Sequence, residues 1–162
     1  MYPILIDIQQ FSVLVIGGGR IATRKVCGLI EAGVKPTVIA PNFSDTLLTA
    51  KKNGKVLLRE RSFQYGDTTG FQVIFICTDN PAVNQAVLNE TTPRQLVNDT
   101  TNQSNSNFFN MAWIKEKDFG IALTTKGANP RKTKLLKEKI RSFLSGDSVS
   151  YTHLTLPTNS LV

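Results

Sequence analysis

Gly17, Gly19 and Ala22 follow an apolar run and form the pattern Gly-x-Gly-x-x-Ala. This spacing is typical of a strand-to-helix turn that holds the pyrophosphate of a dinucleotide. Gly17 permits the tight turn, Gly19 lets the backbone approach the phosphates, and Ala22 keeps the helix close to the sheet. The helix start at Arg20 and Ile21 adds free N–H groups and a partial positive charge. We therefore expect a bound dinucleotide here; a tight turn without a ligand is the alternative.

The strand expected next, at residues 36–40, ends without the acid that usually binds the ribose hydroxyls about 20 residues after the glycines. Pro41 and Asn42 follow it, and Asp45 comes late. We expect Pro41 and Asn42 beside the adenosine ribose, with the Asn42 amide in contact. No arginine stands there to hold a 2′-phosphate, so the sequence favours NAD over NADP.

Polar pairs follow two later apolar strands, and they are Thr78-Asp79 and Asn98-Asp99. In a parallel sheet, ligands meet beyond the carboxyl ends of the strands, so both pairs are candidates for the site. Thr78 and Asp79 are assigned to the cofactor. Asp79-Asn80-Pro81 is also typical of a helix start with an acidic or amide cap, and that role is the main alternative for Asp79.

The elements that must position these residues alternate between short apolar runs and helical spacing. Strands are expected at 12–16, 36–40, 55–60, 72–78 and 95–98, and helices at 21–32, at 44–52 and from the Asn80 region onward. This rhythm predicts a Rossmann-type α/β fold with a doubly wound parallel sheet. The polar stretch 98–107 is too polar for a core and is expected to be a loop.

The pattern changes after residue 112. A strand at 119–125, a turn at 126–129 and a helix at 130–144 are expected. One side of that helix is apolar and carries Leu135, Leu136, Ile140, Phe143 and Leu144. A unit this small cannot form its own core. We therefore expect an NAD-binding domain at 1–112 and a small α+β dimerisation element at 113–148, truncated at its end.

Composition narrows the class of protein further. The chain has 162 residues, of which 41% are hydrophobic and 19% charged, an ordinary globular balance. No apolar stretch reaches the roughly 18 residues of a membrane span, and the N-terminus lacks a signal-peptide pattern, so a cytoplasmic protein is expected. Cys27 and Cys77 lack metal-ligand spacing, and His153 is the only histidine. Neither a metal site nor a His-dependent triad is expected.

The net charge of +7 suits a polyanionic partner. The basic residues of the last helix are Arg131, Lys132, Lys134, Lys137, Lys139 and Arg141. They form either a solvated helix face or a surface that attracts substrate carboxylates. Nucleic-acid binding is not expected, because interleaved aromatic side chains are missing. Residues 149–162 carry no charged residue and resemble a translated sequencing adapter, so we expect a non-native tail; a real terminal strand is the alternative.

Several stretches together resemble the precorrin-2 dehydrogenase domain of siroheme synthases. They are "YPILIDI", "VLVIGGGRIATRK", "TVIAP", "FICTDNPAVN", "LVND…FF" and "TTKGANPRKTKLLKEKI". The resemblance implies a homodimeric oxidoreductase that oxidises precorrin-2 to sirohydrochlorin with NAD, in siroheme (porphyrin-type) biosynthesis. Some members also insert iron, so the resemblance leaves ferrochelatase activity open. The missing acid after residue 40 is a trait of this family.

The resemblance also places the substrate site, with one departure. The family's proposed catalytic aspartate lies three residues after the position of Asn98, where this chain has Thr101. We assign Asp99 as the substitute proton acceptor; Asp79 or water is the alternative. Asn98, Thr101 and Thr125 are assigned to substrate binding, Thr125 because it matches a family serine. The departure also leaves open a non-catalytic, NAD-sensing module.

Overall fold

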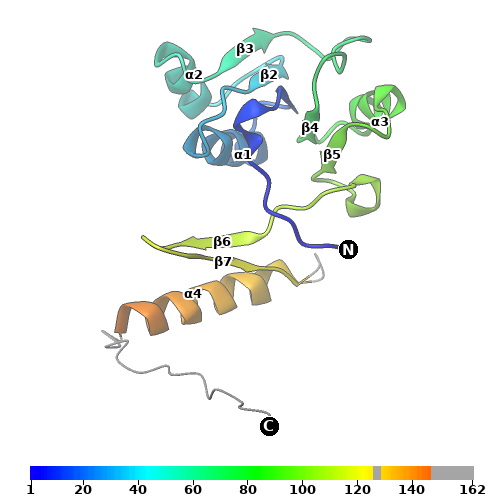
Figure 1. Cartoon of the computed structure of the whole chain (residues 1–162). Helices are drawn as coiled ribbons and strands as arrows, with labels where there is room; N and C mark the ends of the chain where they lie inside the picture. Colours follow the sequence, from blue (N-terminus) through cyan, green and yellow to red (C-terminus); the bar gives the residue numbers. More distant parts are fainter. Residues whose placement is uncertain (126–128, 147–162) are drawn as a thin grey trace. The chain divides into compact units, whose positions relative to one another are not determined.

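The computed structural model describes residues 1–125 and 129–146. The chain forms two compact units, the first at Met1–Phe109 and the second starting at Asn110 (Figure 1). Part of the expected turn, residues 126–128, and the expected tail, 149–162, lie outside the described residues.

The first unit is built on a five-stranded parallel sheet. Its strands are β1 (Val13–Ile16), β2 (Thr37–Ala40), β3 (Leu57–Glu60), β4 (Val73–Ile76) and β5 (Leu96–Asp99). Its α-helices are α1 (Arg20–Glu31), α2 (Asp45–Lys52) and α3 (Pro81–Glu90), with short 3-10 turns at Ile8–Gln10 and Gln103–Asn105. The strand order is β3-β2-β1-β4-β5, and all pairings are parallel. The predicted Rossmann-type class is confirmed. The order reverses between β1 and β4, where such folds bind their ligands.

The central strands β1 and β4 are buried on both faces, which explains why they are apolar throughout. Val13 and Val15 of β1 pack with α1 and α2 on one face. Leu14 and Ile16 point to the other face and pack with α3. The alternation follows from the two-residue period of a strand.

The start of α3 corrects one expectation about Asp79. The N-cap is Asn80, whose Oδ1 accepts hydrogen bonds from the backbone N–H groups of Ala82 and Val83 at 3.0 and 3.3 Å. Of the two caps considered, the amide is therefore the one used. Asp79 precedes the cap and is free of that role.

The polar stretch 98–107 is not simply a surface loop. The loop expectation was wrong for Asp99, whereas Asn98 lies in a strand, as expected for 95–98. Asn98 and Asp99 complete β5 and are buried. The segment after them turns back along β5. The backbone N–H of Val97 donates to Asn107 Oδ1 at 2.7 Å, and that of Asp99 donates to Ser106 Oγ at 2.9 Å. Polar side chains thus satisfy the outer edge of the sheet.

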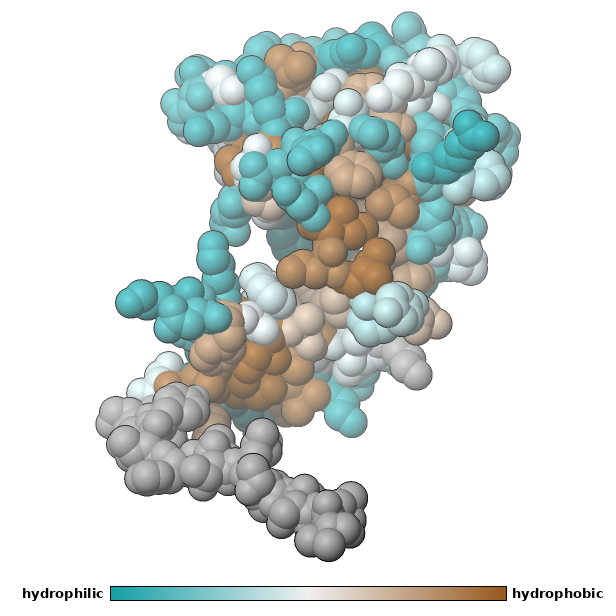
Figure 2. All heavy atoms as spheres, in the orientation of Figure 1, coloured by the Kyte–Doolittle hydropathy of each residue, from teal (hydrophilic) through white to brown (hydrophobic). Residues whose placement is uncertain are grey.

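The second unit contains an antiparallel hairpin and one helix. The hairpin consists of β6 (Ala112–Lys115) and β7 (Gly120–Leu123), and the helix is α4 (Pro130–Gly146). Strand β6 was not predicted. The apolar run here, residues 111–114, is only four residues long, too short to show a period. Figure 2 shows hydrophobic residues gathered on the visible face of this unit. Leu135 and Phe143 of α4 are 52% and 66% exposed.

Candidate dinucleotide site

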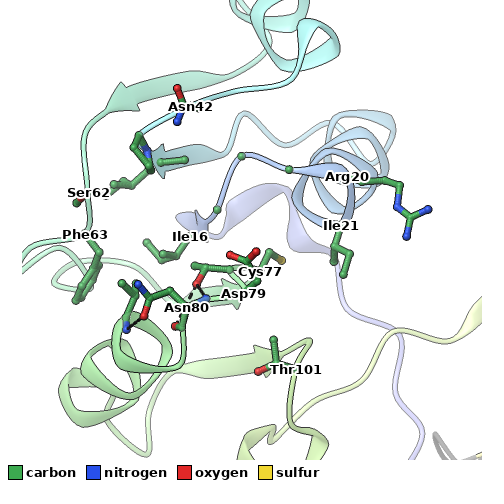
Figure 3. A pocket seen from close by; sticks show the side chains of 18 residues that line it. Ile16, Arg20, Ile21, Asn42, Ser62, Phe63, Cys77, Asp79, Asn80 and Thr101 are labelled. Atoms are coloured by element: carbon green, nitrogen blue, oxygen red, sulfur yellow. Dashed lines mark hydrogen bonds between the residues drawn. The ribbon is translucent and has the colours of Figure 1, made fainter.

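A pocket of about 560 Å³ opens at the carboxyl ends of β1, β2 and β4 (Figure 3). The glycine loop contributes four of the residues assigned to the cofactor, namely Gly17, Gly19, Arg20 and Ile21. The other four assigned residues, Pro41, Asn42, Thr78 and Asp79, also line it. The topology thus brings together side chains from three separate strand ends.

A side chain at each of the three glycines of the loop would have a different effect. Gly17 has a φ of +118°, and a Cβ there would lie 2.5 Å from the carbonyl oxygen of Cys77. A Cβ on Gly18 would overlap the backbone oxygen of Asn42, a constraint that sequence reasoning missed. A Cβ on Gly19 would meet no atom within 4 Å. Gly17 and Gly18 are therefore required by the protein's own packing, whereas Gly19 faces open space.

This geometry fits a dinucleotide pyrophosphate. Helix α1 begins after Gly19, which provides no side-chain cap for the first turn. The first N–H groups of the helix are thus left for an anion, and the open side of Gly19 leaves room for it. The loop is held in place because Ser44 N donates to Gly18 O at 3.1 Å and Thr23 Oγ1 donates to Gly19 O at 2.9 Å.

Two further lining residues, Ser62 and Phe63, were not anticipated. They lie between β3 and β4, beside an ion pair that braces the segment. The Arg61 guanidinium donates to both carboxylate oxygens of Asp67, at 2.6 and 2.7 Å. The hydrogen bond from Arg61 holds the pKa of Asp67 below its ordinary value. No motif marks Ser62 or Phe63, so the sequence alone could not have found them.

Asp99, assigned from the sequence as the proton acceptor, has a different environment from the one expected. It is 4% exposed and is not among the residues that line the pocket. Its Oδ1 accepts from the Thr101 N–H at 2.8 Å and the Thr101 hydroxyl at 2.7 Å, and its Oδ2 accepts from Asn105 at 2.8 Å. The chain therefore turns after Asp99 and does not stay extended to Thr101.

The same contacts set the acidity of Asp99. Burial alone would raise its pKa, but the hydrogen bonds from Asn105 and Thr101 outweigh burial and hold the pKa below the ordinary value. A carboxylate in this state is a weak base. The assignment of Asp99 as proton acceptor stays a prediction, and these contacts argue against it.

Asn98 uses both ends of its amide within the fold. Its Oδ1 accepts from Lys25 Nζ at 3.1 Å, and its Nδ2 donates to Phe108 O at 3.0 Å. Lys25 also lies 5.1 Å from the centre of the Phe75 ring, and burial lowers its pKa. Asn98 does not line the pocket, so its assignment to substrate binding gains no support from this geometry.

Thr101 does line the pocket and is tied to the neighbouring strand end. Asn84 of α3, which the sequence did not mark, connects Thr101 to Thr78 at the end of β4. Its Nδ2 donates to Thr101 Oγ1 at 3.2 Å, and its Oδ1 accepts from Thr78 Oγ1 at 2.9 Å. Thr125 belongs to the second unit, where its hydroxyl accepts from the Asn129 N–H at 3.1 Å, near the start of α4.

The described residues give three further observations, on the Cys77 thiol, on metal ligands and on membrane spans. Burial raises the pKa of Cys77 to about 11, so its thiol stays protonated at neutral pH. Within residues 1–125 and 129–146, no three His, Cys, Asp or Glu side chains come together as a metal site would require. None of the helices in the same ranges combines the length and apolar character of a membrane span.

The sheet order, the glycine loop and the pocket define a Rossmann-type dinucleotide-binding protein. The comparison with family models agrees, since residues 4–112 match a family described as "Putative NAD(P)-binding". The relatives narrow the class further, and the chain belongs to the precorrin-2 dehydrogenase family.

Three relatives and one solved structure carry this conclusion. The chain is 30% identical to precorrin-2 dehydrogenase of Priestia megaterium over all 162 of its residues, which is 80% of that protein. It is 27% identical to precorrin-2 dehydrogenase of Bacillus subtilis, with 93% of each chain covered. It is 32% identical to siroheme synthase of Actinobacillus pleuropneumoniae, but spans only 29% of that longer protein. The solved structure of SirC, a precorrin-2 dehydrogenase, matches with a TM-score of 0.80 and 32% identity over 88% of this chain and 71% of that one.

Proposed function

We propose that this protein is an NAD-dependent oxidoreductase that dehydrogenates precorrin-2 to sirohydrochlorin in siroheme biosynthesis. The observation that carries the proposal is the dinucleotide pocket in a chain that matches precorrin-2 dehydrogenases over most of its length. NAD, when bound, accepts the hydride that leaves the macrocycle. Iron insertion stays an expectation from the sequence resemblance.

The chain's own residues have separate tasks in this proposal. The glycine loop and the first turn of α1 hold the pyrophosphate. Pro41 and Asn42 lie at the end of β2, where the adenosine ribose of a Rossmann cofactor binds. Of the described residues that line the pocket, Arg20 is the one cation, and it lies at the glycine loop rather than after β2. This arrangement supports NAD over NADP.

The direct test is turnover of precorrin-2 by the purified chain with NAD, followed by the absorbance of NADH. We expect stoichiometric formation of NADH and sirohydrochlorin, and faster turnover with NAD than with NADP. Repeating the assay without residues 149–162 tests whether that segment contributes. NAD binding without oxidation of precorrin-2 would instead favour the NAD-sensing module that Thr101 left open.

We further propose that the protein works in the cytoplasm as a homodimer joined through the second unit. The two cysteines, both free thiols, are consistent with a reducing compartment. The apolar side of α4 supports a second copy as its cover, because Leu135 and Phe143 are largely exposed in the single chain.

The variant Phe143→Glu is expected to convert the dimer to a monomer at micromolar concentration, because it places a charge within the apolar side of α4. Sedimentation velocity measures this change. Ser145→Glu adds the same charge on the polar side of the same helix and should leave the dimer intact. A wild-type monomer at micromolar concentration would refute the dimer.

A further inference from the structure

Asp79 places a carboxylate in the pocket, one residue after Thr78 and two residues before α3 begins. Figure 3 shows this carboxylate turned toward the glycine loop. Of the described residues that line the pocket, Asp79 alone carries a carboxylate. The sequence left it with three roles: helix cap, cofactor ligand or proton acceptor.

The structure removes the first of these roles. Asn80 caps α3, so Asp79 is not needed to satisfy the helix. Across residues 1–125 and 129–146 no hydrogen bond or ion pair to the Asp79 side chain is formed, and the residue is exposed. A carboxylate in a ligand pocket with no structural partner keeps all its lone pairs for a ligand or a proton.

Asp99, the other acid considered as proton acceptor, differs from Asp79 in both burial and hydrogen bonding. Asp99 is buried outside the pocket lining, and its oxygens accept from the Thr101 backbone and hydroxyl and from Asn105. A proton on Asp99 would displace at least one of these donors. Protonation of Asp79 would break no hydrogen bond of the described residues.

The position of Asp79 along the pocket also suits a reacting centre. A Rossmann dinucleotide crosses the sheet where the strand order reverses, with its adenosine on the β2 side. The reactive half then lies toward β4 and β5, where Asp79 follows β4 and Thr101 follows β5. Gly17 lies so close to the Cys77 carbonyl that the glycine loop and residues 77–79 are adjacent in the lining of the pocket.

We propose that Asp79 is the catalytic proton acceptor of the dehydrogenation, an inference that rests on the proposed function. The substrate loses one hydride, with its electron pair, to the nicotinamide of NAD. It loses one proton to the Asp79 carboxylate, and the electrons of that bond form the new double bond of the macrocycle. NAD is thereby reduced to NADH, and the exposed Asp79 releases its proton to water.

The test is Asp79→Asn, which keeps the size of the side chain and removes its basicity. We expect kcat for precorrin-2 to fall by about 100-fold or more, the usual scale for general base catalysis. The Kd of NAD, measured by calorimetry, should stay within about twofold of wild type. Asp45→Asn, an exposed acid of the first turn of α2 outside the pocket lining, should change neither quantity.

A second variant separates proton transfer from mere positioning. In Asp79→Ala, added formate should restore part of the lost kcat, because a small carboxylate can enter the vacated space and accept the proton. A lowered kcat without rescue would overturn the proposal, since it would assign Asp79 to orientation. A raised Kd of NAD with an unchanged kcat would overturn it in favour of a cofactor ligand.

The experiments distinguish an incorrect role for Asp79 from an incorrect proposed function. Wild-type turnover together with an equally active Asp79→Asn variant overturns only the role of Asp79. A wild-type chain that binds NAD but does not oxidise precorrin-2 overturns the function, and the role of Asp79 with it.

Discussion

Gly19→Asp is expected to weaken NAD binding by about 100-fold or more, while the fold stays intact. The added side chain projects into the open space where the pyrophosphate is expected, since a Cβ on Gly19 meets no atom within 4 Å. Two like charges in contact at a partly buried site cost on the order of 3 kcal/mol, which corresponds to a factor of about 100. Isothermal titration calorimetry with NAD measures the change.

The matched control is Gly28→Asp. Gly28 lies on the same helix, a Cβ there also meets no atom within 4 Å, and the residue is outside the pocket lining. This variant should bind NAD as the wild type does. Equal NAD affinity in Gly19→Asp and wild type would disprove the placement of the pyrophosphate at this loop.

Asp99→Ala is expected to destabilise the first unit by about 3 kcal/mol or more, because it removes a buried, charged acceptor that takes four hydrogen bonds. The donors are the backbone and hydroxyl of Thr101, the backbone of Asn102 and the amide of Asn105. For a chain of this size the loss corresponds to a drop of roughly 6–12 °C in Tm. Thermal unfolding followed by circular dichroism measures it.

Asp99→Asn separates the charge from the hydrogen bonds and predicts a pH dependence. The pKa of Asp99 is lowered in the folded state, so the ionised carboxylate stabilises the fold above the unfolded pKa of about 3.9. That contribution is lost as the pH falls through the folded pKa. The stability difference between wild type and Asp99→Asn should therefore be largest near neutral pH and shrink as the pH falls into the acid range. A constant difference from pH 7 to pH 2 would contradict this explanation.

The same Asp99→Asn variant also decides the role assigned from the sequence. If Asp99 accepts the proton, turnover falls by about 100-fold at a temperature where the variant is fully folded. If Asp79 accepts it, turnover of the folded Asp99→Asn variant stays close to wild type.

The sequence predicted the sheet well because the information is local. The runs that became β1, β2 and β4 are buried along their whole length, so their composition alone marks them as strands. The glycine loop is recognisable for the same reason, since the spacing of Gly17, Gly19 and Ala22 lies within one strand-to-helix turn, although the clash that excludes a side chain at Gly17 comes from the Cys77 carbonyl. Strand β6 escaped prediction because its stability depends on pairing with β7, as Trp113 does with Ala122.

The site was predictable only where backbone geometry decides the role. The environment of Asp99 depends on Asn105, and that of Asn98 depends on Lys25, 73 residues earlier in the chain. Neither partner is marked by a motif. Ser62 and Phe63 reach the pocket through a segment braced by Arg61 and Asp67, which is likewise a tertiary effect.

The polar segment that follows β5 has a consequence for solubility. An edge strand presents unpaired N–H and C=O groups on which another protein molecule can add a strand and begin to aggregate. Here Asn107 and Ser106 occupy the N–H groups of Val97 and Asp99, and the Asn107 N–H occupies the Val97 carbonyl at 3.0 Å. The segment after β5 thus makes hydrogen bonds that a sixth strand would make. Another protein molecule therefore cannot add a strand at these positions of the edge.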